Sequence, residues 1–114
     1  MLDKVPYRFD RAYYRVVYPL TARPILRMGE VTAIVVDLSE AGFRILIPRG
    51  WTPRVGDPVE GRIRLVSGTE HEVEGEILRV SPPQVAGRLE QGIPFGDMMA
   101  EQRWLQQRFF SWLA

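Results

Sequence analysis

Two short motifs contain residue types that bind anions and polar groups. Arg11 and Arg15 stand four positions apart, and Asp37, Ser39 and Gly42 form an Asp-x-Ser-x-x-Gly pattern. Guanidinium groups bind phosphates and carboxylates through two parallel hydrogen bonds. The second pattern is also typical of a turn that an Asp or Ser side chain closes through the backbone. Taken singly, the motifs leave both an anion-binding site and a purely structural role open.

The charge of the chain is unevenly distributed. Residues 1–28 carry six basic and two acidic side chains, a balance of +4, whereas the remainder carries nine basic and twelve acidic ones, a balance of −3. A basic segment beside a mildly acidic body favours an anionic partner near the N-terminus. Alternatively, these basic residues only form a solvated surface with no partner.

The elements that must position these residues are mostly strands. Turn signals recur at short intervals between runs of strand-forming residues, which is typical of an all-β meander, sandwich or barrel. Apolar and charged residues alternate over 43–47, 59–65 and 85–95, as in strands with one buried face. The pattern over 70–80 changes phase, which predicts a β-bulge near Ile77. The first strand is expected to run from about Val16 to Met28.

A single amphipathic helix is expected over about 97–113. Asp97 is a plausible N-cap, and an apolar stripe follows at helical spacing; the stripe consists of Met98, Leu105, Phe109, Trp112 and Leu113. We expect this stripe to cover an open barrel end or a sheet face. Trp104 and Phe110 lie outside the stripe, and exposed aromatic surface of this kind can mark a partner or homodimer contact.

Length and composition place the chain in one broad class. Its 114 residues suit a single domain, which we divide into an arm over 1–15 that carries the arginine pair, a β-barrel over 16–96 and a helix over 97–114. No apolar run approaches the roughly 20 residues of a membrane span, and no secretory signal opens the chain. Zero cysteines exclude disulfides and thiolate metal sites. These features predict a cytoplasmic protein.

Catalytic constellations are missing from the sequence. His71 is the only histidine and lies in a glutamate-rich strand, where a surface role is expected. There is no serine–histidine pairing, phosphate-binding loop, dinucleotide fingerprint or metal-ligand cluster. We therefore expect no enzyme activity, no catalytic residues, no metal and no cofactor.

The order of the two motifs is more specific than either alone. The arginine pair directly precedes a strand, and the Asp-x-Ser-x-x-Gly motif begins 22 residues after Arg15, at the end of the next strand. Further strands, Gln91-Gly92-Ile93-Pro94-Phe95 and a helix follow. Over residues 8–113 this arrangement resembles the PilZ family. The resemblance implies a mainly β fold, a six-stranded antiparallel split β-barrel with a C-terminal α-helix, and binding of the bacterial second messenger cyclic di-GMP.

The resemblance also implies roles for individual residues. Arg11 and Arg15 would clamp guanine and phosphate, because a guanidinium fork matches the O6 and N7 acceptors of guanine and also pairs with phosphate. Asp37 would accept from guanine N–H groups, Ser39 would add a hydroxyl, and Gly42 would allow a tight turn, with a positive φ, close to the ligand. Asp10 places a like charge beside this anion site, and Arg8 is expected to compensate as an auxiliary residue.

Two other functions are consistent with the sequence. A PilZ-like module can act without ligand, through an unidentified protein partner alone. A nucleic-acid-binding small barrel is the second alternative, but it would need basic and aromatic residues across its strands, whereas these strands carry many glutamates. No direct nucleic-acid binding is therefore expected. The downstream pathway and the ligand stoichiometry are not encoded in the motifs.

Overall fold

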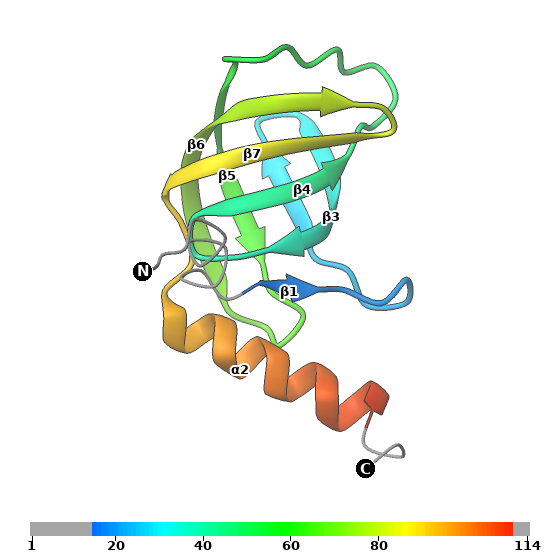
Figure 1. Ribbon diagram of the computed structural model, residues 1–114, viewed down its shortest axis with the longest axis vertical. Helices are drawn as coiled ribbons and strands as arrows, with labels where there is room; N and C mark the ends of the chain where they lie inside the picture. Colours follow the sequence, from blue (N-terminus) through cyan, green and yellow to red (C-terminus); the bar gives the residue numbers. More distant parts are fainter. Residues whose placement is uncertain (1–14, 111–114) are drawn as a thin grey trace, which may run out of the picture.

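The structure, a computed structural model, describes residues 15–110 and contains a closed antiparallel β-barrel with one helix (Figure 1). Its strands are β1 (Val16–Val17), β2 (Ile25–Met28), β3 (Val31–Leu38), β4 (Gly42–Leu46), β5 (Pro58–Arg64), β6 (Glu70–Ser81) and β7 (Gln84–Gln91). The strand order is β3-β2-β5-β6-β7-β4, and pairing of β4 with β3 closes the ring. The predicted six-stranded barrel is confirmed, and the short β1 is an additional strand on β3.

Strand alternation in the sequence translates directly into the barrel core. Phe43 and Ile45 point inward from β4, and Val59 and Ile63 do so from β5, while the charged residues between them face outward. Closure of the sheet brings these inward faces together, so that one apolar core fills the barrel. The period of two is therefore sufficient to sort inside from outside on these strands.

The bulge expected near Ile77 is present. The register between β6 and β7 shifts between Ile77 and Arg79, which leaves Leu78 as the extra residue. Ile77 is buried, whereas half of the surface of Leu78 is exposed. The extra residue changes the phase of the strand, as the sequence pattern indicated.

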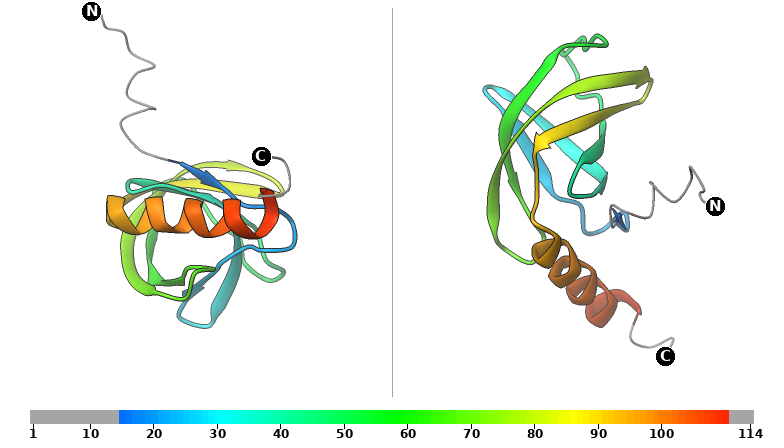
Figure 2. Two further views of the ribbon diagram at one scale, coloured as in Figure 1. Left: turned by 90° about the horizontal axis from the view of Figure 1, so that it is seen from below. Right: turned by 60° about the vertical axis from the view of Figure 1, so that its left-hand side comes forward.

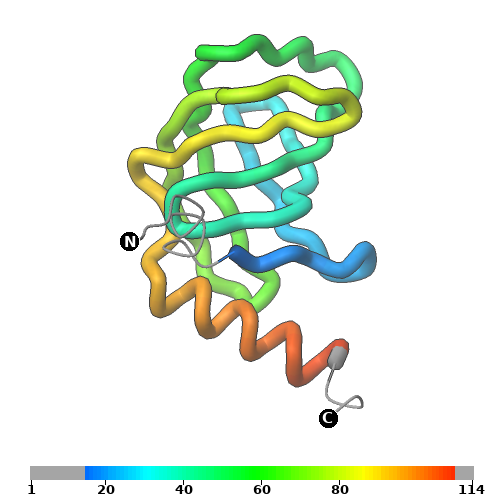
Figure 3. The backbone as a smooth tube through the Cα atoms, viewed as in Figure 1, coloured from blue at the N-terminus to red at the C-terminus, as the bar shows by residue number. Residues whose placement is uncertain are grey.

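The prediction of one continuous first strand from Val16 to Met28 is wrong. Residues 18–24 form a loop that separates β1 from β2, and the Ala22 N–H donates to the Pro19 carbonyl in its turn. Pro19 and Pro24 have no N–H to donate to a strand ladder, which explains the interruption. The loop lets β1 run beside β3 near the helix (Figure 3).

The helical segment lies across one end of the barrel (Figure 2). It consists of α2 (Phe95–Leu105) and a π-helical turn η1 (Gln106–Phe110). The helix starts two residues before the expected position, so the prediction of Asp97 as the N-cap is wrong: Pro94 holds that position and Asp97 lies in the first turn. Met98 and Leu105 are buried, as the stripe predicted. Trp104, which was expected outside the stripe, packs partly buried against the core. Trp112 and Leu113 lie outside the described residues.

A buried carboxylate fastens this helix to the barrel. Glu101 is fully shielded from solvent and accepts hydrogen bonds from the Tyr18 hydroxyl (2.8 Å), the Val66 N–H (2.8 Å) and the Ser67 N–H (3.1 Å). Burial, and then the neighbouring Glu101 carboxylate, raise the pKa of Tyr18 above its ordinary value, so the hydroxyl keeps its proton and donates. One side chain thus joins α2, the residue after β1 and the β5–β6 turn.

Within residues 15–110, no helix has the length and apolar character needed to cross a membrane.

Candidate ligand-binding site

The Asp-x-Ser-x-x-Gly motif forms the tight connection between β3 and β4. The Ser39 N–H donates to the Gly42 carbonyl at 2.9 Å, and the Ser39 hydroxyl accepts from the Ala41 N–H at 3.3 Å. From the neighbouring strand, the Leu89 N–H donates to the Ala41 carbonyl at 2.8 Å. Backbone and side-chain bonds therefore hold this turn in one conformation against the end of β7.

Gly42 serves close packing and not an unusual backbone angle. The positive-φ glycines of the described chain are Gly29, Gly50, Gly56 and Gly68, so the expected positive φ at Gly42 is wrong. A Cβ on Gly42 would lie 3.1 Å from the Gly87 carbonyl oxygen, closer than ordinary van der Waals contact. A glycine is favoured here because β4 and β7 approach each other closely at this point.

Asp37 lies at the end of β3 with its carboxylate largely buried. It pairs across the sheet with Val17 of β1 on one side and with Arg44 of β4 on the other. Arg44 Nη1 lies 3.6 Å from Asp37 Oδ2. Burial raises the pKa of Asp37 above its ordinary value, and the positive charges of Arg44 and Arg15 partly oppose that rise.

Arg15 is the member of the arginine pair that the structure describes. It immediately precedes β1, whose pairing of Val16 with Leu38 brings it next to the Asp37–Gly42 turn. Its guanidinium is exposed and close enough to influence the Asp37 carboxylate electrostatically. Arg11 and the auxiliary Arg8 lie outside the described residues. Of the five predicted site residues, Arg15, Asp37, Ser39 and Gly42 therefore lie together.

Arg44 was not among the predicted site residues. With Arg79, Ser81, Gln84 and Ala86 it lines a shallow depression of about 240 Å³ on the outer face of β4, β6 and β7. The signal was present in the sequence: a three-residue connection between Leu38 and Gly42 places Asp37 opposite Arg44 in the hairpin. Arg44 is thus a second cation beside the turn, and it lines the same depression as Arg79.

Gly92 also supports the site from outside the two motifs. A Cβ at Gly92 would lie 1.9 Å from the Glu40 carbonyl oxygen, a distance that no side chain can accept. The segment after β7 therefore packs directly on the turn between β3 and β4. The sequence marked this segment as Gln91-Gly92-Ile93-Pro94-Phe95, but its contact with Glu40 follows only from the tertiary structure.

Comparisons with known proteins agree with this architecture. The sequence model of the PilZ domain matches residues 9–111. Among solved structures, the Bacillus subtilis Inhibitor of motility (MotI/DgrA) is similar, with a TM-score of 0.61 and 16% sequence identity over 87% of this chain. The match spans 51% of that protein, so the present chain corresponds to about half of its length. No curated protein matches the chain.

Proposed function

The chain belongs to the PilZ domain family, and on this basis we propose that it is a receptor for cyclic di-GMP that changes its contacts with a protein partner when the ligand binds. The proposed ligand-binding residues are Arg11, Arg15, Asp37, Ser39 and Gly42, with Arg8 as an auxiliary residue. Arg44 is added on the basis of its position beside Asp37.

The observation that carries the proposal is the proximity of Arg15 and the Asp37–Gly42 turn. Pairing of β1 with β3 brings Arg15 next to the turn that begins 22 residues later in the sequence, at Asp37. An exposed guanidinium and a carboxylate then face the same region from neighbouring strands. Such a pair can recognise a ligand that carries both phosphate acceptors and guanine N–H donors.

Each side chain has a chemical task in this proposal. Arg15 pairs with a phosphate or with the O6 and N7 edge of guanine. Asp37 accepts from the guanine N–H groups when Arg44 moves from the carboxylate to a phosphate. The Ser39 hydroxyl is engaged with its own turn, so its main task is to fix the position of Asp37.

The expected affinity is moderate. Hydrogen bonds to charged groups contribute about 1.5–3 kcal/mol each, so four or five of them sum to roughly ten. Ordering a segment around the ligand costs on the order of 2–5 kcal/mol. The remainder corresponds to a Kd near about 1 μM, which suits a messenger whose concentration rises and falls. Asp10 beside Arg11 lowers this affinity, and Arg8 offsets the loss.

The proposed switch depends on joining two parts of the chain. Cyclic di-GMP would contact Arg11 and Arg15 on one side and the Asp37–Gly42 turn on the other, which fixes the arm over 1–15 against the barrel. A ligand shifts such an equilibrium only by its higher affinity for the joined form. The partner would then meet a different surface in the two states.

Isothermal titration calorimetry with cyclic di-GMP tests this proposal, with GTP and cyclic GMP as ligand controls. We expect Arg15→Ala to weaken binding at least tenfold while the thermal unfolding midpoint barely changes, because Arg15 is exposed. Arg49→Ala, at another exposed arginine in the connection from β4 to β5, is the matched control and should bind like the wild type. Unchanged affinity of Arg15→Ala would remove this residue from the site. No binding by the wild type would favour the ligand-independent interaction module.

A further inference from the structure

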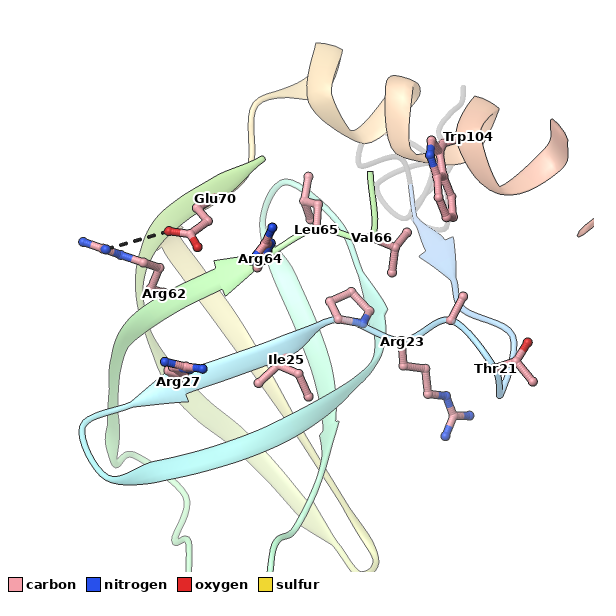
Figure 4. A pocket seen from close by; sticks show the side chains of 12 residues that line it. Thr21, Arg23, Ile25, Arg27, Arg62, Arg64, Leu65, Val66, Glu70 and Trp104 are labelled. Atoms are coloured by element: carbon pink, nitrogen blue, oxygen red, sulfur yellow. Dashed lines mark ion pairs between the residues drawn. The ribbon is translucent and has the colours of Figure 1, made fainter. Parts of the chain in front are cut away.

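An open groove with a basic lining runs along β2 and β5 below α2 (Figure 4). Its volume is about 880 Å³. Four arginines line it, Arg27 from β2, Arg62 and Arg64 from β5 and Arg23 from the loop before β2, and Trp104 lies at its α2 end. We refer to these five residues as the basic groove. None of them belongs to the proposed cyclic di-GMP site.

The cross-strand pairing in the basic groove is unfavourable for the isolated fold. Arg27 lies directly opposite Arg62 in the β2–β5 ladder, and like charges in this position destabilise a sheet. Arg62 is compensated by Glu72 at 2.9 Å and Glu70 at 3.8 Å. Arg23, Arg27 and Arg64 have no ion pair with any other residue in 15–110. Arg64 lies opposite Glu70 in the β5–β6 ladder, and Glu70 is the one acidic residue of the groove lining. Four arginines against one glutamate leave the groove with an excess of positive charge.

Arg23 contributes a donor that the fold does not use. Its Nε is shielded from solvent, and no group among residues 15–110 accepts its N–H. Buried donors are normally paired, so an unpaired one needs an explanation. Because Nε is shielded, a bound carboxylate could pair with it only after the Arg23 side chain changed its rotamer.

The α2 end of the groove is aromatic and apolar. Trp104 is directed from α2 toward the groove (Figure 4), and Arg108 stacks on the indole with its guanidinium carbon 4.7 Å from the ring centroid. Ile25 adds a side chain that is 37% exposed, and Val66 completes this end of the lining. An aromatic or aliphatic side chain could pack here while neighbouring carboxylates reach the arginines.

From this combination we propose that the basic groove docks an acidic peptide segment of a protein partner, with one aromatic or aliphatic residue seated against Trp104. Charge complementarity selects carboxylates, and the indole provides an anchor of the type that dominates protein interfaces. The groove is open along its length, whereas pockets for small molecules usually enclose most of the ligand. An extended segment is therefore the better occupant.

The neighbouring strand argues against a nucleic acid. Next to β5, the outer face of β6 carries Glu70, which lines the groove, and beyond it Glu72, Glu74 and Glu76 at every second position. A polyanion with a charge at every nucleotide would extend past the groove onto these carboxylates and be repelled. A peptide, in contrast, can carry acidic residues only at the positions that contact the arginines of the groove.

The groove is also connected to the proposed ligand site. Residues 18–24 join β1 to β2, so Arg15, just before β1, and Arg23, just before β2, are separated by β1 and this short loop. The Tyr18 N–H donates to the Val36 carbonyl, and the Tyr18 hydroxyl binds Glu101 of α2. Docking itself does not depend on cyclic di-GMP, but any change in peptide affinity on adding cyclic di-GMP would depend on the proposed function.

Fluorescence anisotropy of a labelled peptide tests the docking site. The peptide alternates Asp-Glu pairs with single Leu residues and ends in Trp; a version with Lys in place of Asp and Glu is the charge control. We expect saturable binding of the acidic peptide, weakened by added salt, and none of the Lys version. The double variant Arg27→Glu/Arg64→Glu should lower the affinity at least tenfold, while Arg49→Glu, outside the groove, should not. Circular dichroism confirms that each variant is folded.

Three results would overturn the docking site. They are no saturable binding of the acidic peptide, an affinity unchanged by the double reversal in a folded protein, and tighter binding of oligothymidylate than of the peptide at equal salt. A parallel titration of cyclic di-GMP separates this inference from the proposed function. Peptide binding without cyclic di-GMP binding would refute the receptor function and support the docking site. Cyclic di-GMP binding without peptide binding would support the receptor function and refute the docking site.

Discussion

Replacing the buried Glu101 should lower the free energy of unfolding by a large and measurable amount. Its two oxygens accept from Tyr18, Val66 and Ser67, all within 3.1 Å. Three hydrogen bonds to a charged acceptor would sum to about 4–9 kcal/mol if each contributed fully. The two backbone donors lie in a partly buried turn where water can replace the carboxylate. The Tyr18 hydroxyl is buried and would stay unpaired.

We therefore expect Glu101→Ala to lower the free energy of unfolding by about 3–5 kcal/mol, the usual cost of removing one partner from a buried charged interaction. This is a large part of the roughly 5–15 kcal/mol that stabilises a small domain. Urea denaturation followed by circular dichroism measures the loss. Arg103→Ala, at an exposed position of the same helix, is the matched control and should stay within about 0.5 kcal/mol of the wild type.

A double-mutant cycle with Tyr18→Phe identifies the origin of the loss. Tyr18→Phe alone removes one hydrogen bond to Glu101, whereas in the Glu101→Ala background it removes a hydroxyl that is already unpaired. Tyr18→Phe should therefore lower the free energy of unfolding much less in the Glu101→Ala background than in the wild type. Strict additivity of the two substitutions, or a Glu101→Ala variant as stable as Arg103→Ala, would refute the role of this carboxylate in fastening the helix.

The remaining predictions concern Asp37 and two glycines. Burial raises the pKa of Asp37 above 3.8, so the stability that this residue contributes is present below pH 3.8 and is lost as the pH rises through its folded-state pKa. Asp37→Asn should therefore be more stable than the wild type at neutral pH in urea titrations, with a smaller advantage in acid; a constant difference across pH would contradict this sign. Cyclic di-GMP affinity should fall as acid protonates Asp37, as calorimetry over a pH series would detect. Gly92→Ala should cost about 1–3 kcal/mol, because its Cβ would meet the Glu40 carbonyl, and should also weaken ligand binding. Gly96→Ala, in α2 with open space around it, should instead stabilise the fold by about 0.5–1 kcal/mol in thermal denaturation; equal effects of the two glycine changes would exclude the steric explanation.

Much of the barrel follows from local patterns along the chain. The period of two over β4, β5 and β7 assigns the inward faces, and the phase change near Ile77 marks the bulge. These properties are local because a strand residue faces the core or the solvent according to its position in the pleat. The break between β1 and β2 departs from the local pattern, because Pro19 and Pro24 lack the backbone donors that a continuous strand needs in spite of the β-propensity around them.

The residues of the candidate site also fall into those that local sequence predicts and those that only the tertiary structure places. Asp37, Ser39 and Gly42 were selected from their spacing, since one tight turn holds all three. The packing of Gly92 on Glu40, in contrast, joins residues 52 positions apart. Arg44 lies between these cases, because its ion pair with Asp37 follows from hairpin register once the turn length is known.

The sequence by itself determined the family, because the order of motifs and elements is written along the chain. It also determined the strand faces and the turn that carries the Asp-x-Ser-x-x-Gly motif, because these depend on neighbours within one or two elements. Only the tertiary structure decided that Glu101 is a buried acceptor and that Arg23, Arg27 and Arg64 share one groove with Trp104. Closure of the barrel brings β2 next to β5 and lays α2 across the end, and these contacts between distant segments leave no periodic trace in the chain. The physical reason is that burial and charge compensation depend on what lies opposite a residue in space.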